Sequence, residues 1–435
     1  MPDLLILVAV GALWFPTVDF RIGPASLNLC ELALMAAAPS LLSSTVLRQN
    51  FAPKAALVVG GFTVMTVLSG LQILYVTDAT GTLGVLIKFA LSAIFVLLLL
   101  SSRQREAITR QAIRVFCWAG FASLLVSNLD YFFDVLGGVT YAQVGDRRSM
   151  GFFEHANQYA IWIISLVPLV LLVSRNIVFA SLALLNIGLA LVVTGSKFNL
   201  ALVFVIAWFA LGLRARLRLS ILIPAAIPVF AFAYASVMNT VINIMRLVNP
   251  EYAEKVQVAI EDPLNAYSVV DRLALWQSAV DHAAESPVIG IGGGQAYTVL
   301  TYPHAHNIVL QYLLTYGVLG AVVILLLFCV AFAASVEGKP ADTDSYRAKH
   351  ALTLSLTSLF ISNQFSDSMA SQQILLFGII VGILLALNRT RCSGDRERTS
   401  SVSTAKTRRS YRTFDTNASA GSSQLMRRRY ALQNR

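Results

Sequence analysis

The sequence predicts an all-α, polytopic membrane protein with about twelve transmembrane helices. Two observations support this fold class. Of the 435 residues, 56% are hydrophobic and only 13% are charged, a composition too apolar for a soluble chain of this length. The apolar residues also gather into runs about as long as a helix needs to cross a bilayer. We therefore expect one transmembrane domain over residues 1–388.

The expected spans follow one another along this domain, and the first run is short for a bilayer. They cover residues 4–18, 27–47, 54–76, 83–101, 111–128, 156–174, 177–194, 198–213, 219–241, 306–335, 350–366 and 371–388. Two long loops separate some of these runs, one over residues 129–155 and a larger one over residues 243–303, before the tenth span.

Lys and Arg predict the orientation, because basic residues accumulate in cytosolic loops. They cluster in alternate loops, for example over residues 103–114, 214–218 and 339–349. These loops and both termini are therefore expected in the cytosol. The two long loops must then lie on the opposite side.

The formal charge of +10 comes almost wholly from the last segment of the chain. Residues 389–435 hold 12 Lys and Arg against 3 Asp and Glu, whereas the first 388 residues hold 21 against 20. A short basic tail after the last span is typical of disordered cytosolic sequence beside anionic lipid. We interpret the tail as an orientation signal, with a partner-binding tail as the alternative, and expect no nucleic-acid partner.

The sequence contains few signs of cofactor chemistry. The four cysteines form no CxxC zinc signature, and no GxxxxGK[ST] phosphate loop occurs. Asp342 and Asp344 resemble a metal-carboxylate pair, but they lie in a short linker and are expected to be solvated. We therefore predict neither a metal nor another cofactor.

The most informative stretch is HAHNIVLQYLLTYGVLG, residues 304–320, which places His304 and His306 at the mouth of an apolar run. On a continuous helix, His306, Gly317 and Gly320 share one face, and the two glycines form a narrow seam for a neighbouring helix. A histidine there can act as an acid–base group. We take His306 as the candidate base and His304 as its reserve. A metal site is the alternative, but no third ligand is evident.

Cationic residues accumulate on the same side of the expected membrane domain. Arg272 is expected on the polar face of a short amphipathic helix in the second long loop, and that helix ends at a glycine run, residues 290–294, expected to be a lid or hinge. With Arg147, Arg148 and Lys197, this arginine could bind an anion such as a diphosphate.

His306-Asn307, nine residues, Gly317, two residues and Gly320 resemble the H-[N/S/Q]-x9-G-x-x-[G/T/Y] signature of the O-antigen ligase and polysaccharide polymerase superfamily. Three further segments, in the expected order, are similar to parts of this family: Arg272, Trp276, Pro287, Gly290 and Gly292; the segment 151–157 that ends in Asn157; and Thr194-Gly-Ser-Lys197, with lysine where arginine is usual. The resemblance covers roughly residues 145–335.

The resemblance implies a type C membrane glycosyltransferase of surface polysaccharide biosynthesis in the bacterial inner membrane. Such enzymes transfer a glycan from undecaprenyl diphosphate to an acceptor hydroxyl on the periplasmic face, without an obligatory metal. By this analogy His306 and His304 are catalytic, the four cations with Asn157 and Asn307 bind substrate, and Gly290, Gly292, Gly317 and Gly320 are structural. The implied partners are the lipid-linked donor, a glycan or lipid-core acceptor, membrane lipids, and chain-length or export proteins.

The alternative function is a transporter or flippase of lipid-linked oligosaccharide. Such proteins more typically have short loops, repeated halves and charge near the bilayer midplane. This chain has a loop of about sixty residues by its sequence spacing, and its charges lie at one depth. The motifs leave the choice between ligase and polymerase open.

Overall fold

The computed structural model describes residues 2–17, 19–22, 25–42, 52–141, 148–211, 267–302, 304–337, 342–365 and 372–388, with isolated positions between 242 and 258. Arg147, the expected span 219–241, most of the long loop before residue 267, and the basic tail lie outside these residues.

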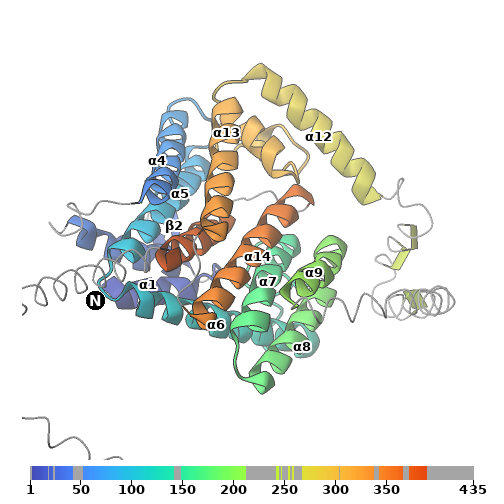
Figure 1. Ribbon diagram of the computed structural model, residues 1–435. Helices are drawn as coiled ribbons and strands as arrows, with labels where there is room; N and C mark the ends of the chain where they lie inside the picture. Colours follow the sequence, from blue (N-terminus) through green and yellow to red (C-terminus); the bar gives the residue numbers. More distant parts are fainter. Residues whose placement is uncertain are drawn as a thin grey trace, which may run out of the picture. The chain divides into compact units, whose positions relative to one another are not determined.

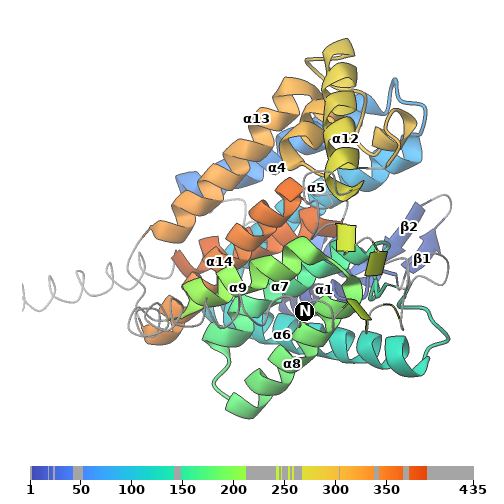
Figure 2. The ribbon, with the colours of Figure 1, turned by 90° about the vertical axis from the view of Figure 1, so that its right-hand side faces the viewer.

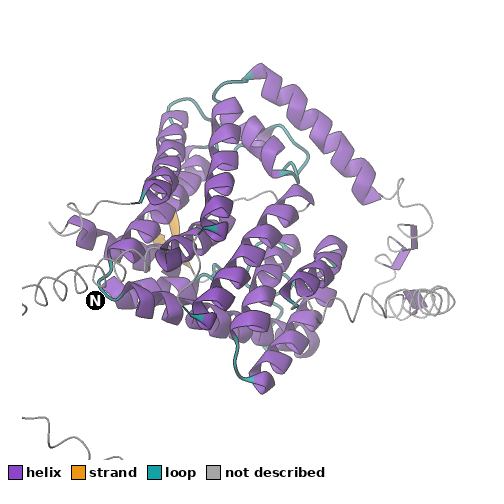
Figure 3. Cartoon of the chain, viewed as in Figure 1, coloured by secondary structure: helices purple, strands orange, loops and turns teal. Residues whose placement is uncertain are grey.

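The described chain is predominantly helical, with one short hairpin (Figure 1, Figure 3). The α-helices are α1 (Pro2–Ala12), α2 (Leu29–Ala37), α4 (Pro53–Gln72), α5 (Ala79–Ser101), α6 (Arg105–Phe133), α7 (Ala156–Val173), α8 (Ile177–Thr194), α9 (Lys197–Ala210), α12 (Tyr267–Glu285), α13 (Ile308–Val336), α14 (Thr343–Phe365) and the helix Gln372–Asn388. Two 3-10 helices are η1 (Ala38–Leu42) and η2 (Ala296–Thr298), and strands β1 (Asp19–Ile22) and β2 (Ala25–Asn28) pair antiparallel.

The chain is an all-α multi-pass membrane protein. Within the described residues, six helices are long and apolar enough to cross a bilayer: α4, α5, α6, α7, α8 and α13. Four shorter apolar helices accompany them, including Lys197–Ala210 and Gln372–Asn388. The expected runs other than 219–241 overlap helices, but the count of twelve spans remains a prediction.

The first expected span is shorter than the sequence indicated, and the described part of the second, to Leu42, is not one continuous α-helix. Helix α1 ends at Ala12, and α2 has nine residues before the chain tightens into η1. The hairpin between them was not predicted from the sequence. Asn28, at the end of β2, caps α2: its Oδ1 accepts from Glu31 N, and Glu31 Oε2 accepts from Asn28 N, both at 3.0 Å.

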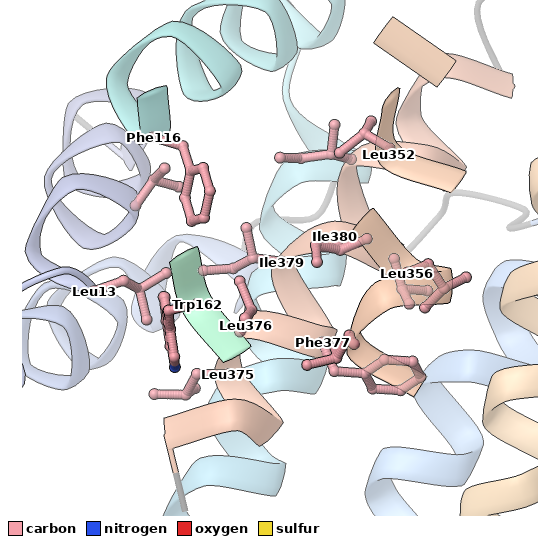
Figure 4. Packing of buried hydrophobic residues seen from close by; sticks show 14 of the residues in the cluster. Leu13, Phe116, Trp162, Leu352, Leu356, Leu375, Leu376, Phe377, Ile379 and Ile380 are labelled. Carbon is pink, nitrogen blue, oxygen red and sulfur yellow. The ribbon is translucent and has the colours of Figure 1, made fainter. Parts of the chain in front are cut away.

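Helix α7 lies at the centre of the packing, because it is apolar on every side. Its Trp162 is fully buried, with ring centroids 5.5 Å from Trp14 and 6.4 Å from Phe116. Figure 4 shows Trp162 beside side chains of the helix Gln372–Asn388, such as Leu376. The N-terminal half of α7 is therefore held firmly by the core.

Polar contacts also join α7 and α9 to α14. Ser355 Oγ donates to the Ser165 carbonyl oxygen at 2.7 Å, and Ser362 Oγ donates to Asn199 Oδ1 at the same distance. Small hydroxyl residues let helices approach closely in a membrane protein, where apolar side chains gain little from leaving lipid.

Candidate functional site

Helix α13 is interrupted at Gly317, where φ is 64° and ψ is −164°. Only glycine adopts this backbone conformation readily. The expected continuous face of His306, Gly317 and Gly320 is therefore wrong: the helix begins at Ile308, beyond His306, and changes direction at Gly317. A Cβ on Gly320 would lie 2.0 Å from Tyr316 Cβ of the same helix, so this glycine accommodates the break and not a neighbouring helix.

The segment that crosses the break is the stretch 287–292 after α12. Val318 N donates to the Pro287 oxygen at 2.8 Å, and the amides of Ile291 and Gly292 donate to the oxygens of Leu314 and Thr315, each at 3.0 Å. These bonds use carbonyl and amide groups that the helix break releases. We call this arrangement the glycine crossing, because Gly290 and Gly317 each lie against the backbone of the segment that contains the other.

Close backbone packing explains both glycines of the crossing. A Cβ on Gly290 would lie 2.4 Å from Thr315 C, and one on Gly317 would lie 2.3 Å from Val288 C. Residues 290–294 were expected to form a lid or hinge. The structure shows a packed crossing in their place, and a close approach was the right explanation for Gly317 with the wrong partner.

Two buried glutamines tie the crossing to α4 and α5. Gln72 Nε2 donates to the oxygens of Ile289 and Thr315 at 2.7 and 2.8 Å, and its Oε1 accepts from Gly293 N at 2.8 Å. Gln295 Nε2 donates to the Asp78 oxygen at 2.7 Å. The amides of both glutamines are thereby satisfied in a buried environment, which holds the segment before the histidines in one place.

The histidine pair is anchored through the residue between its members. Ala305 is fully buried, and its N–H donates to Gln311 Oε1 at 2.8 Å. It packs in a second apolar cluster with Leu275 and Ala279 of α12. In Figure 2, α12 lies beside the upper part of α13. This packing determines where the two histidines on either side of Ala305 lie.

Helix α12 packs through Leu275, Ala279 and Ala283, which are at most 5% exposed. Arg272 and Trp276 are partly buried and follow the same stripe at helical spacing. Arg272 was expected on the polar face of this helix, and that expectation is wrong: Arg272 lies at the edge of the packed face. Leu273, the next residue, is 57% exposed.

The two histidines have different neighbours. The His304 ring lies 6.2 Å, centroid to centroid, from the ring of His155, which precedes α7. The His306 ring lies 6.2 Å from that of Tyr302, and His306 has a positive φ of 52°. Positive φ is uncommon outside glycine and often accompanies functional sites. His155 was not among the predicted site residues, although its place within the segment 151–157, which ends in Asn157, was a usable signal.

Arg148 connects two of the sequence motifs. Its Nε donates to the Thr194 oxygen at 2.6 Å, and its Nη2 donates to Asn157 Oδ1 at 3.1 Å. Thr194 is the last residue of α8, and Lys197 is the first of α9. We call Arg148, His155, Asn157, Thr194 and His304 the α7 cluster. The structure thus brings together the 151–157 segment, the Thr194–Lys197 segment and one histidine.

Two helices begin at the α7 cluster, and in both the side chain of the residue before the helix makes no capping hydrogen bond. These are α7, preceded by His155, and α9, preceded by Ser196. The N-terminal amides of a helix attract anions. Helix α13 differs, because Asn307 Oδ1 accepts from the amides of Val309 and Leu310 at 3.0 and 3.1 Å. Asn307 was predicted to bind substrate, and its observed contacts are those of a helix cap.

The Asp342–Asp344 pair has structural partners. Asp342 Oδ1 accepts from Ser345 N at 2.7 Å and so caps α14, and this backbone hydrogen bond holds the pKa of Asp342 below its usual value. Asp344 forms an ion pair with Arg175. The described residues contain no group of three or more His, Cys, Asp or Glu side chains suited to a metal ion.

Residues 179–325 match the O-Antigen ligase family. The match confirms the superfamily resemblance that the motifs indicated. It includes Lys197, Arg272, both histidines and the glycine crossing, whereas Arg148, His155 and Asn157 precede it. The match suggests membrane glycan transfer in polysaccharide biosynthesis. No curated protein matches the chain.

Proposed function

We propose that the chain transfers a glycan from undecaprenyl diphosphate to an acceptor hydroxyl, at a site formed by the α7 cluster and His306. In this reaction the bond between the sugar C1 and the diphosphate oxygen breaks, and the leaving diphosphate retains the electron pair. The acceptor oxygen forms the new bond to C1 and loses its proton to a base. The protein must therefore bind an anion and hold a base near the acceptor.

The observation that carries the proposal is the junction at Arg148, which joins the starts of α7 and α9. Its guanidinium contacts Thr194 and Asn157, and Lys197 begins α9 one residue after Ser196. A cation beside two helix N-termini suits a diphosphate. Lys197 contributes a single point charge, where an arginine would offer two parallel donors. Arg272 and Arg147 are further candidates for the donor.

The base assignment rests on the position of the histidines before α13. His306 remains our candidate, because the superfamily motif centres on it and its positive φ is a conformation that surrounding structure must maintain. His304 lies nearer to His155 of the α7 cluster. Separate substitutions of the two histidines therefore decide which one accepts the proton.

Charge at the far end of α7 supports a periplasmic site. A cavity of about 440 Å³ at that end is lined by four arginines: Arg110, Arg114, Arg175 and Arg347. Its lining includes residues 172–175 at the C-terminal end of α7, whereas the α7 cluster adjoins the N-terminal end. A helix of this length separates the two by about 27 Å at 1.5 Å per residue. Basic residues favour the cytosolic side, so the cluster is proposed to face the periplasm.

The decisive experiment uses the purified full chain in lipid vesicles with an undecaprenyl-diphosphate-linked glycan and an acceptor, without any ion gradient. We expect glycan transfer, measured by the size of the product and by the release of undecaprenyl diphosphate. One product of fixed size indicates a ligase, and a ladder of lengths indicates a polymerase. If the donor crosses the vesicle membrane and no transfer occurs, the chain is a transporter and the proposal fails.

A further inference from the structure

A second cavity, of about 280 Å³, opens beside the start of α7. It is enclosed by segments from several parts of the chain. Its lining residues come from the turn after α1, the start of α2, the third turn of α5, the segment before α7 with its first turn, and the start of the helix Gln372–Asn388. At this volume it lies near the lower end of small-molecule sites in proteins, so it suits one ring rather than a long chain.

A buried ion pair forms one wall of this cavity. Glu31 is 2% exposed, and its Oε1 lies 3.5 Å from Lys88 Nζ. Its other oxygen, Oε2, accepts from Asn28 N in the cap of α2. Within the described residues, Oε1 has no hydrogen-bond partner. A buried carboxylate with an unused acceptor is costly unless a ligand or a water completes its bonds.

The remaining polar lining is made of groups that bond hydroxyls. Gln158 is 3% exposed, and Gln372 and Glu154 complete this part of the wall. Carboxylates accept hydrogen bonds, amides both donate and accept, and an ammonium group donates, which together match hydroxyl groups that do both. Phe152 and Phe153 add an apolar surface. The face of a sugar ring that carries its C–H bonds can pack on such a surface.

The charge of the lining argues against a phosphate. Glu31 and Glu154 oppose one cation, Lys88, so the ionisable lining carries a formal charge of −1. A phosphate group would be repelled here, whereas a neutral polyhydroxylated ring has no such cost. The cationic groups for an anion lie elsewhere, at Arg148 and Lys197. The two places thus differ in the chemistry of the ligand that they suit.

The start of α7 connects the two places. Glu154 and Gln158 line the cavity, while His155 and Asn157, their immediate neighbours in sequence, belong to the α7 cluster. We propose that this cavity binds one neutral sugar unit of the acceptor, next to the site where its hydroxyl reacts. That this sugar belongs to the acceptor rests on the proposed function, but the binding of a neutral sugar can be tested without that function.

The first test measures binding directly. The full chain in nanodiscs is mixed with free D-glucose, D-galactose, N-acetyl-D-glucosamine or L-rhamnose, and saturation transfer to the sugar is recorded by NMR. We expect transfer to at least one sugar, reduced about tenfold in affinity by Gln158→Leu and Glu154→Gln, as expected for loss of a hydrogen bond worth about 1.4 kcal/mol. Gln277→Leu, at an exposed position of α12, is the matched control and should bind as the wild type does.

Glu31 is left unchanged in this test, because its cap of α2 makes a folding defect expected. Gln372→Leu, at the start of the helix Gln372–Asn388, is the third variant. The melting temperature of each variant shows whether its fold is intact. If none of the four sugars binds to the wild-type chain, or if the three variants bind as well as the control does, the proposal is overturned.

The second test uses the transfer assay. Glu154→Gln and Gln158→Leu should raise the KM for the acceptor about tenfold while the KM for the lipid-linked donor stays unchanged. If transfer occurs and both constants are unchanged, the cavity inference fails and the proposed function stands. If sugar binds but no transfer is seen with any acceptor, the proposed function fails and the cavity remains a sugar site.

Discussion

Gly317 lies against the backbone of Val288, so closely that a Cβ on residue 317 would be 2.3 Å from both the carbonyl carbon and the carbonyl oxygen of Val288. The contact joins the interrupted helix α13 to the segment that leads from α12 to the histidines. The superfamily motif spaces His306 and Gly317 by a set number of residues, and the structure gives this spacing a physical meaning. The histidine and the helix break are two ends of one rigid turn-and-helix segment.

Substitution of Gly317 tests this relationship. We expect Gly317→Ala to lower stability, because the backbone conformation alone costs about 1–3 kcal/mol for a residue with a Cβ, and the clash with Val288 adds to it. Thermal unfolding of the detergent-solubilised chain measures the effect. Gly60→Ala is the matched control: Gly60 lies in α4 with nothing within 4 Å of a Cβ, and alanine there should be neutral or slightly stabilising. Equal melting temperatures of the two variants would contradict the crossing.

The Gln72 side chain offers a second test of the crossing. Gln72→Leu removes three hydrogen bonds while keeping a similar volume, and each buried group left without a partner costs about 1–3 kcal/mol. We expect a lower melting temperature and reduced glycan transfer, because the segment before His304 loses its anchor. Gln277→Leu, at an exposed position on α12, should melt as the wild type does. The anchor role is refuted if Gln72→Leu matches this control.

The histidines before α13 are expected to differ in their effect on catalysis. His306→Ala should abolish glycan transfer, a loss of at least about a hundredfold for a general base, while the protein still inserts and melts normally. His304→Ala should act more weakly, through the contact with His155. His350→Ala, on α14 and far along the sequence from both, should transfer normally. Near-normal transfer by His306→Ala would remove the base assignment, and a larger loss in His304→Ala would move it to His304.

Arg148 and Lys197 are expected to respond in opposite ways to exchange of one cation for the other. Arg148→Lys should raise the KM for the donor, because one ammonium group cannot bond both Thr194 and Asn157 as the guanidinium does. Lys197→Arg should maintain or improve donor use, whereas Lys197→Ala should weaken it. Arg103→Lys, in the loop before α6, is the control. The dependence of the initial rate on donor concentration decides, and a rate curve unchanged in Arg148→Lys and Lys197→Ala would eliminate their proposed role in binding diphosphate.

Much of the helical framework is predictable from local composition. The bounds of α7 and α8 follow the apolar runs closely, since long uninterrupted apolar stretches have few other stable conformations in a membrane. The beginning of the chain was predicted less well. Helices α1 and α2 are as apolar as a span but shorter than one. The hairpin between them has no strong local signal in the sequence.

The candidate site divides in the same way. Most of its residues were visible in the sequence, with His155 as an exception, because histidines, cations and glycines at set spacings are rare in apolar runs. Their partners were not. Gly317 was correctly expected to permit a close approach, but that the approaching backbone is residues 287–289 depends on how α12 packs on α13. Arg272 was placed on the wrong face for a related reason: tertiary contacts decide that the side with Leu275 and Ala283 is the buried one.

Local chemistry, then, specifies which residues carry charge, where helices run, and which histidines and cations are candidates for a site. Periodicity and composition act over a few turns of chain, so they are encoded locally. The pairing of Arg148 with Thr194 and Asn157, the meeting of His155 with His304, and the sharing of α7 between the cluster and the cavity all join segments far apart in sequence. Only tertiary packing decides such pairings, because they depend on which surfaces of the helices are buried against one another.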